Sequence, residues 1–192
     1  MTNHIDFYFD IISPYTYIAH KKILKHKNVV FNYKPIYLGG LHKLAGIDSP
    51  AFNKYKLRNN INDCNLVSEK NNIEFNWNSK FPINSLNIMR GYISVTKDKQ
   101  NDYLNSFFDA YWKDNQDLSN VDNISKLLSN LKIDSEEFFK SIKERSIKDK
   151  LIKLTNDAFQ NEVFGVPTFI INNKIFWGQD RLEYALEEFN AY

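Results

Sequence analysis

The sequence predicts an α/β protein in which a large all-helical insertion separates a βαβ unit from a ββα unit. Two observations support this prediction. Short aromatic, β-prone runs lie close to both ends of the 192-residue chain. Between them, from about residue 49 to residue 160, apolar residues recur at helical spacing almost throughout. Because no tract rich in Pro, Gly or Ser interrupts the chain, we expect the insertion to pack on the core as one unit.

The first unit is predicted to run through strand, helix and strand. Residues 5–10 (IDFYFD) have the aromatic, β-prone character of a largely buried strand. Ser13 is a good N-cap and Pro14 suits the first helical position, so a helix is expected from there to about Lys25. A second strand fits residues 29–34, which a proline closes. The inner face of the helix would carry Tyr17, Ile18, Leu24 and the aliphatic stem of Lys21.

The insertion is predicted to contain five or six helices. Breaks in the helical pattern fall at Pro82, at residues 114–120 and at residues 132–135. Asp134 followed three positions later by Glu137 is typical of a helix start. Two domains are therefore expected: a discontinuous α/β domain, residues 1–45 and 160–192, and a helical insertion domain, residues 46–159.

The last unit is predicted to be a hairpin followed by a helix. Residues 167–171 (PTFII) and 174–177 (KIFW) are short β-prone runs. Asn172 and Asn173 lie between them, and asparagine tolerates the positive φ of a two-residue hairpin turn. Residues 178–181 (GQDR) then open an amphipathic helix. One face of this helix would carry Leu182, Ala185, Leu186 and Phe189.

Composition and charge argue against several classes of protein. The formal net charge is only +2 and the basic residues are spread along the chain, unlike the clustered basic stripe of a nucleic-acid-binding protein. No signal-peptide pattern and no run of about 18 apolar residues occurs, so we expect a soluble, cytoplasmic protein that does not contact a membrane. The single cysteine, Cys64, excludes an intramolecular disulfide and is expected in the core.

Histidines and aromatic residues suggest structural roles. The four histidines have no metal-ligand spacing, so no metal site is expected, and all four are predicted to lie near the surface: His4, His20, His26 and His42. A cluster of aromatic residues at helical spacing is better explained as core than as a cofactor site, and part of it could line an apolar substrate pocket between the two domains: Phe107, Phe108, Tyr111 and Trp112.

Five segments occur in an order that resembles a known family. They are residues 9–17 (FDIISPYTY), 37–43 (YLGGLHK), 81–86 (FPINSL), 164–169 (FGVPTF) and 176–181 (FWGQDR). This set resembles the DsbA-like group of thioredoxin folds, specifically the kappa-class glutathione transferases and the 2-hydroxychromene-2-carboxylate isomerases. The resemblance implies a thioredoxin-like fold (βαβ…ββα) that carries the helical insertion, and it implies glutathione as the cofactor.

Ser13 is the candidate catalytic residue. Disulfide oxidoreductases of this fold carry a Cys-x-x-Cys pair where the first helix begins, because the helix terminus favours a thiolate. Residues 13–16 here read SPYT, so dithiol chemistry is impossible, although the anion-stabilising helix terminus remains. The resemblance implies that the Ser13 hydroxyl hydrogen-bonds the glutathione sulfur and keeps it ionised. The alternative is that Ser13 is an ordinary N-cap.

Two later segments are the candidate glutathione-binding residues. The resemblance implies a cis Pro167, with the backbone of Val166 free to hold the cysteinyl part of glutathione as an added strand would. The alternative is a proline that simply starts a strand. The resemblance also implies that Gly178, Gln179, Asp180 and Arg181 receive the γ-glutamyl end, with Asp180 facing its ammonium group. The alternative is that Asp180 caps the helix and Arg181 is solvated.

Candidate substrate residues are less well defined by the resemblance. Lys43 follows a glycine pair and could meet a substrate carboxylate, or it is a solvated surface charge. The family usually has a Gly-Asn pair where this chain has Gly46 and Ile47. Asn53 or Lys54 could supply the missing polar contact.

Three functions are compatible with these residues. The leading hypothesis is a glutathione-dependent cis–trans isomerase of the 2-hydroxychromene-2-carboxylate type, acting on an unsaturated aromatic pyruvate-like substrate through reversible addition of the glutathione thiolate. The first alternative is a kappa-like transferase that conjugates glutathione to small electrophiles. The second is a noncatalytic DsbA-like domain that binds peptides, as a chaperone would, through its proline edge. By resemblance, a homodimer and a role in aromatic degradation are also expected.

Overall fold

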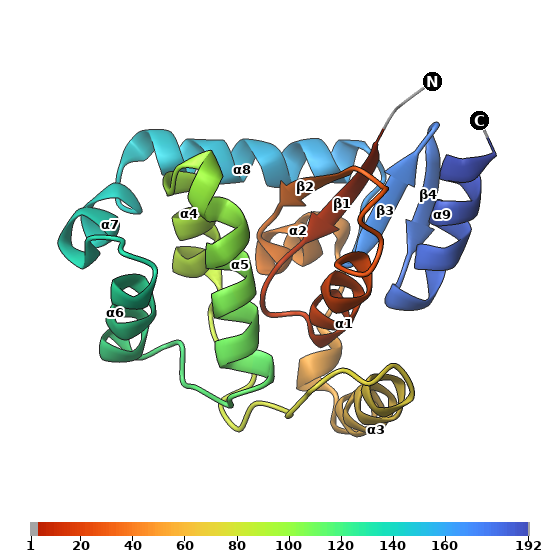
Figure 1. Ribbon diagram of the computed structural model, residues 1–192, viewed down its shortest axis with the longest axis horizontal. Coiled ribbons are helices and arrows are strands. Elements are labelled where there is room, and N and C mark those ends of the chain that lie inside the picture. Colours follow the sequence, from red (N-terminus) through yellow and green to blue (C-terminus); the bar gives the residue numbers. More distant parts are fainter. Residues whose placement is uncertain (1–3, 192) are drawn as a thin grey trace.

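A computed structural model describes residues 4–191, in which a four-stranded sheet is surrounded by helices (Figure 1). The strands are β1 (Ile5–Phe9), β2 (Phe31–Pro35), β3 (Thr168–Ile171) and β4 (Lys174–Trp177), in the spatial order β2-β1-β3-β4. β1 pairs in parallel with β2, whereas the pairs β1–β3 and β3–β4 are antiparallel. The predicted α/β, thioredoxin-like class with βαβ and ββα units is confirmed.

Side chains alternate across the sheet into two buried clusters. Ile5, Phe7 and Phe9 of β1 belong to the larger cluster, which also contains the buried residues of α1 (Pro14–Ile23) and α9 (Leu182–Asn190). Tyr8 belongs to the smaller cluster, with residues of α2 (Leu38–Ala45) and α8 (Arg145–Gln160). Because strand side chains alternate between faces, β1 is covered by helices on both sides. The strand is therefore central and largely buried, as its aromatic sequence predicts.

The first unit follows the prediction closely, with one correction. Helix α1 begins at Pro14 and ends at Ile23, and β2 begins at Phe31 rather than at residue 29. Tyr17 and Ile18 are fully buried, as expected. Leu24 was predicted on the inner face but is 45% exposed. The reason is that it lies after the last helical residue, so the helical periodicity no longer directs it inward.

Helix α2 was not predicted, because Gly39 and Gly40 disfavour a helix. One local contact and one long-range contact compensate. The ring of Tyr37 lies against both glycines, and the amide of Leu38 donates to the Asp10 carboxylate at 2.8 Å. A carboxylate at a helix N-terminus satisfies an otherwise free amide and favours the helix dipole.

Residues 49–160 form six α-helices and one 3-10 turn, consistent with the predicted five or six helices. The 3-10 turn is η1 (Pro50–Phe52), and the helices are α3 (Lys54–Lys70), α4 (Leu86–Ser94), α5 (Lys97–Trp112), α6 (Val121–Asn130), α7 (Ser135–Ser141) and α8. Asp134 caps α7 as predicted, since its side chain accepts from the Glu137 amide at 2.8 Å. The breaks α4–α5 and α7–α8 carry no proline or glycine and were not predicted. The division into two domains stays a prediction.

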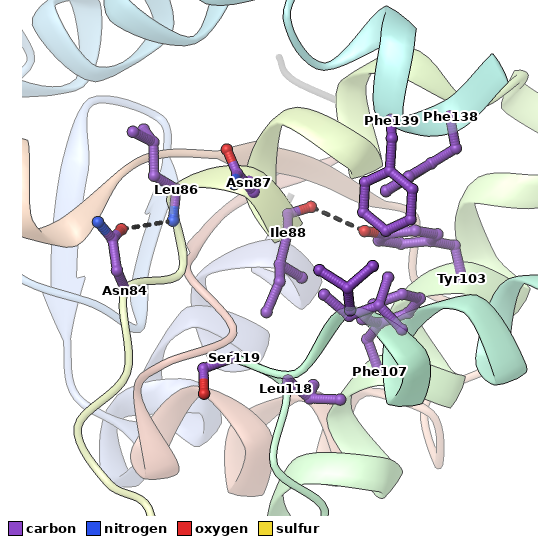
Figure 2. A pocket seen from close by; sticks show the side chains of 12 residues that line it. Asn84, Leu86, Asn87, Ile88, Tyr103, Phe107, Leu118, Ser119, Phe138 and Phe139 are labelled. Carbon is purple, nitrogen blue, oxygen red and sulfur yellow. Dashed lines mark hydrogen bonds between the residues drawn. The ribbon is translucent and has the colours of Figure 1, made fainter. Parts of the chain in front are cut away.

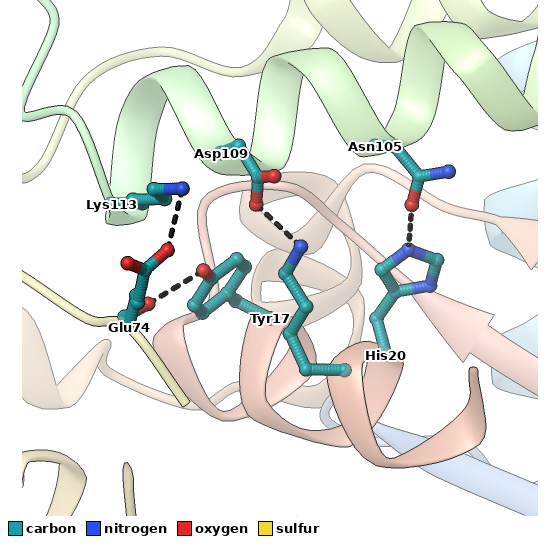
Figure 3. Close-up of polar contacts among 7 residues, drawn as sticks. Tyr17, His20, Glu74, Asn105, Asp109 and Lys113 are labelled. Atoms are coloured by element: carbon teal, nitrogen blue, oxygen red, sulfur yellow. Dashed lines mark hydrogen bonds and ion pairs between the residues drawn. The ribbon is translucent and has the colours of Figure 1, made fainter. Parts of the chain in front are cut away.

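Helix α1 is tied to α5 by polar contacts (Figure 3). Lys21 forms an ion pair with Asp109 at 2.6 Å, and His20 Nε2 lies 2.7 Å from the Asn105 side-chain oxygen. The other ring nitrogen of His20 lies 3.1 Å from the Tyr33 hydroxyl. Burial lowers the pKa of His20 to about 4, so the ring is neutral at pH 7. The prediction that all four histidines lie near the surface is therefore wrong for His20, whose partners come from β2 and α5.

The aromatic cluster of α5 is core, as predicted. Phe107, Phe108, Tyr111 and Trp112 are all fully buried, and so is Cys64 of α3. The indole of Trp112 also donates to the carbonyl of Ile11 at 2.8 Å. This bond holds the loop between β1 and α1 against the helical part of the molecule.

The last unit confirms the predicted hairpin. Asn172 and Asn173 both have positive φ, at 50° and 62°, the combination that a two-residue turn between twisted strands needs. Residues Gln179–Arg181 form a 3-10 turn, η2, and α9 begins only at Leu182. Its predicted inner face is buried at Leu182, Ala185 and Leu186 and half-buried at Phe189. None of the helices formed by residues 4–191 is long and apolar enough to cross a membrane.

Asp10, at the end of β1, connects three parts of the fold. One carboxylate oxygen accepts from the Ile12 amide at 3.1 Å. The other accepts from the Leu38 amide at 2.8 Å and from the Ser85 hydroxyl at 2.9 Å. The side chain is fully buried, and this burial raises its pKa from 3.8 to about 6 despite the three hydrogen bonds. The carboxylate thus joins the β1–α1 loop to the start of α2 and the start of α4.

The raised pKa of Asp10 predicts a specific pH dependence of stability. The folded protein binds a proton at Asp10 more tightly than the unfolded chain, so this group makes the free energy of unfolding fall as pH rises from about 4 to about 6. The difference between the two pKa values corresponds to about 3 kcal/mol. Urea unfolding of wild type and Asp10→Asn at pH 4 and pH 7 should show wild type losing about this much relative to the variant.

Two comparisons make this result interpretable. The lowered pKa of His20 acts in the opposite direction over a similar pH range, but it is present in both proteins and cancels in the difference. The exposed Asp102→Asn serves as the control and should keep the wild-type pH profile. Parallel pH profiles for wild type and Asp10→Asn would contradict the assignment.

Close packing of α4 gives a second prediction. A Cβ added at Gly91 would overlap the rings of Phe138 and Tyr103, which are both buried. We expect Gly91→Ala to lower the free energy of unfolding by about 1–3 kcal/mol, as overpacking does. Gly40→Ala is the control, because it brings the same gain in helix propensity without a clash in the core. The atom nearest to an added Cβ there belongs to the half-buried Tyr37 side chain, which can move. Equal stability of the two variants in urea would refute the packing argument.

Candidate functional site

Ser13 lies where the β1–α1 loop becomes helix. Its side-chain oxygen accepts from the Thr16 amide at 3.2 Å, so it caps α1, and it donates to the carbonyl of Val166 at 3.1 Å. Its own amide donates to the Asp10 carbonyl at 3.2 Å, closing the turn that presents it. The residue is 5% exposed. The hydroxyl is therefore held from both sides at the N-terminus of a helix, where negative charge is favoured.

The second part of the site is the segment before β3. The peptide bond between Val166 and Pro167 is cis. Residue pairing of β3 with β1 and with β4 starts only at Thr168, so Val166 belongs to no strand ladder of the described sheet. The structure thus brings Val166 and Ser13 into direct contact across 153 residues of sequence. The two candidate segments, which are far apart in the sequence, are therefore neighbours in the fold.

The third part is the segment between β4 and α9. The amide of Gly178 donates to the Pro167 carbonyl at 2.9 Å, which places this segment directly beside the cis-proline. Gly178 has a φ of 115°, a conformation that a side chain would disfavour. The Gln179 side chain is turned inward, and its oxygen accepts from Lys22 of α1 at 2.7 Å. Asp180 and Arg181 are both exposed, with their charged groups 3.5 Å apart.

The three candidate substrate residues lie on other elements. Lys43 is exposed in the last turn of α2, and Lys54 is the exposed first residue of α3. Asn53 caps α3, with its side-chain oxygen accepting from the Tyr55 and Lys56 amides at 3.1 Å each. Within residues 4–191 none of these three forms a hydrogen bond with Ser13, Val166 or the segment after β4. The capping role explains Asn53 without a substrate.

Two residues close to Ser13 received no functional role from the sequence: Tyr15 and Asp10. Tyr15, in the first turn of α1, lies beside Asp63 and Cys64 of α3, and burial together with these contacts raises its pKa. Burial raises the pKa of the Cys64 thiol to about 12, so it stays protonated and is a poor nucleophile at pH 7. The signal for Asp10 was present in the sequence, since an acidic residue ends an otherwise apolar strand just before a helix start.

The chemistry of the site depends on these positions. Residues 13–16 offer hydroxyl groups at Ser13, Tyr15 and Thr16, of which Thr16 is fully buried, and no thiol. Such a site has no redox-active thiol of its own. The N-terminus of α1 and the Ser13 hydroxyl nevertheless suit the anionic sulfur of a bound thiol compound. In the described part of the chain, no three His, Cys, Asp or Glu side chains lie so that they could hold a metal ion.

The chain is similar in sequence and in fold to known proteins. The chain is 24% identical over 189 residues to the 2-hydroxychromene-2-carboxylate isomerase of Sphingobium xenophagum, with 96% of each chain covered. A stretch of 51 residues is 47% identical to glutathione S-transferase kappa 1 of Caenorhabditis elegans, covering 24% of this chain and 23% of that protein. A solved 2-hydroxychromene-2-carboxylate isomerase shares the fold with a TM-score of 0.89 at 23% identity, over 97% of this chain and 94% of the other.

The family model described as a DSBA-like thioredoxin domain matches residues 4–190. This match spans the sheet, the helical insertion and the last helix. The chain therefore belongs to the DSBA-like thioredoxin domain family.

Proposed function

We propose that this protein is a glutathione-dependent isomerase of the 2-hydroxychromene-2-carboxylate type. The observation that carries the proposal is the contact between the Ser13 hydroxyl, at the start of α1, and the carbonyl of Val166, before a cis-proline. This arrangement pairs a hydroxyl at a helix N-terminus with a cis-proline segment and offers no thiol of its own, which supports the proposal. Relatives of nearly full-length similarity carry the isomerase name.

The residues present fit glutathione in one continuous path. Ser13 contacts Val166, Pro167 contacts Gly178, and the exposed Asp180 comes two residues later. In the proposed orientation the sulfur lies at the N-terminus of α1, the cysteinyl backbone pairs with Val166, and the γ-glutamyl ammonium group meets the Asp180 carboxylate. Gln179 acts indirectly, because its bond to Lys22 fixes this segment against α1.

Ser13 would orient glutathione and stabilise its negatively charged sulfur, rather than attack the substrate itself. The chemistry that glutathione supplies when bound is a thiolate that adds reversibly to a conjugated double bond and leaves again once rotation has occurred. The Ser13 hydroxyl donates its proton to Val166 in the structure, and a sulfur anion would compete for that same donor. Since Thr16 donates to the Ser13 oxygen, the hydroxyl keeps its position while its hydrogen changes partner.

The substrate side of the proposal rests on charge. An unsaturated aromatic pyruvate-like molecule carries a carboxylate, and Lys43 on α2 is the proposed cation for it.

The second candidate function is glutathione conjugation to small electrophiles, favoured by the local similarity to a kappa-class transferase. Both functions use the same Ser13 site and differ in the step after thiolate addition, which is elimination in one and release of the conjugate in the other.

Replacing Ser13 should weaken thiolate binding. A hydrogen bond to a charged group contributes about 1.5–3 kcal/mol, so Ser13→Ala should raise the pKa of bound glutathione by about 1–2 units. Calorimetric titration with glutathione and ultraviolet thiolate absorbance across pH would measure this. Ser13→Gly keeps most of the capping stability and should show the same loss, whereas Ser141→Ala, which removes a hydroxyl–carbonyl bond in α7, should behave as wild type. Well-folded wild type that does not bind glutathione would refute the proposal and favour a peptide-binding domain.

Product analysis separates the two enzymatic functions. An isomerase should convert 2-hydroxychromene-2-carboxylate to a product of the same mass, with glutathione recovered in full. A transferase should consume glutathione and form a stable thioether. Mass spectrometry of the reaction mixture with the Ser13→Ala variant as control decides between them, and a stoichiometric conjugate would contradict the isomerase proposal.

A further inference from the structure

A cavity of about 300 Å³ is lined by residues of α4 and the segment before it, α5, the loop after α5, α6 and α7 (Figure 2). We propose that this cavity is a second binding site, which takes a small, neutral, aromatic molecule. The proposal does not rest on glutathione or on the reaction proposed for Ser13. It rests on the chemistry of the cavity walls, on the size of the cavity and on the uncharged character of its described lining residues.

The walls are apolar and aromatic. Six buried residues form the inner surface: Ile88, Tyr103, Phe107, Leu118, Ile124 and Phe138. The one hydroxyl among these six, that of Tyr103, already donates to the Ile88 carbonyl at 2.9 Å, as Figure 2 shows. The hydrogen of the Tyr103 hydroxyl is therefore already bonded within the protein and is not offered to a ligand. Such an interior favours a planar hydrocarbon body, which can stack on or meet the edges of the rings.

The size of the cavity sets the size of the ligand. An engineered apolar cavity of about 150 Å³ stays dry and binds benzene. The cavity here has about twice that volume, which corresponds to a molecule with two fused rings. Natural ligand pockets start at about this volume and combine apolar walls with a few polar groups.

The rim is polar but uncharged. Asn84, Asn87 and Ser119 lie at the exposed edge of the cavity. The Asn84 oxygen accepts from the Leu86 amide at 3.0 Å, and the Ser119 hydroxyl donates to Asp117 at 2.5 Å. No Lys, Arg, His, Asp or Glu of the described chain lines the cavity. Because an anion would lose its hydration without gaining a cation, the site selects a neutral molecule with at most one hydrogen-bonding group near the rim.

The cavity is separate from the Ser13 site. Among the described residues, none that lines it comes from α1, from the segment around Pro167 or from η2. The nearest link is Ser85, which lies between two lining residues and donates to Asp10 at 2.9 Å. An anionic substrate of the proposed reaction would find no counter-charge on these walls, so the occupant of the cavity differs in charge from that substrate.

Indole, a neutral two-ring molecule with one N–H group, is the probe that tests the proposal. Calorimetry and ligand-observed NMR should show one indole bound per chain, with indole-3-carboxylate bound at least tenfold more weakly. Val121→Trp, at the 57%-exposed edge of the cavity, and Ile124→Phe, inside it, should each weaken indole binding by tenfold or more. Ile152→Trp, on the exposed side of α8, is the matched control and should bind indole as wild type does. Saturating glutathione should leave the indole affinity unchanged.

Three results would overturn the proposal. They are the absence of saturable indole binding, equal binding by wild type and both cavity variants, and displacement of indole by glutathione. Val121→Trp replaces an exposed residue, so loss of binding in that variant is not explained by misfolding. Glutathione titration of the same samples tests the function proposed for Ser13 separately, and either proposal can fail while the other holds.

Discussion

The buried carboxylate of Asp10 is the interaction on which the arrangement of the site depends. It receives hydrogen bonds from its own loop, from the start of α2 and from the start of α4, and its side chain has no exposed surface. Burying a charge is unfavourable, and three donors offset that cost only while all three elements stay in place. A change at any one of them would leave an unpaired group in the interior. The turn that presents Ser13 is thereby coupled to the start of α2 and to the start of α4.

Sequence reasoning succeeded where the structure is determined locally. Ser13 and Pro14 predict the start of α1, Asn172 and Asn173 predict the hairpin, and Asp134 predicts the start of α7. Each of these is a short-range effect of one residue on its neighbours. The inner faces of α1 and α9 were predicted from periodicity except at Leu24, where the helix had already ended.

The features that sequence reasoning missed depend on distant partners. Helix α2 contains two adjacent glycines and forms because Asp10, 28 residues away, meets its first amide. His20 is buried because Tyr33 and Asn105 satisfy its ring nitrogens. The contact between Ser13 and Val166 could be expected only from resemblance, since no local pattern links residues 153 positions apart. The cavity within the helical part was not predicted either. Its walls come from four helices and two connecting segments, and periodicity in the sequence does not specify how these pack together.

The order of the strands has a consequence for how the molecule is made. The central strand β1 is synthesised before the helical insertion, yet one of its two neighbours, β3, is synthesised after it. A chain emerging from the ribosome therefore presents an aromatic, hydrogen-bonding strand edge while the whole helical insertion is still being produced. Long-range pairing of this kind slows folding, and unpaired edges invite aggregation. The parallel partner β2 pairs with one edge of β1 early, whereas the other edge stays unpaired until the β3–β4 hairpin has been synthesised.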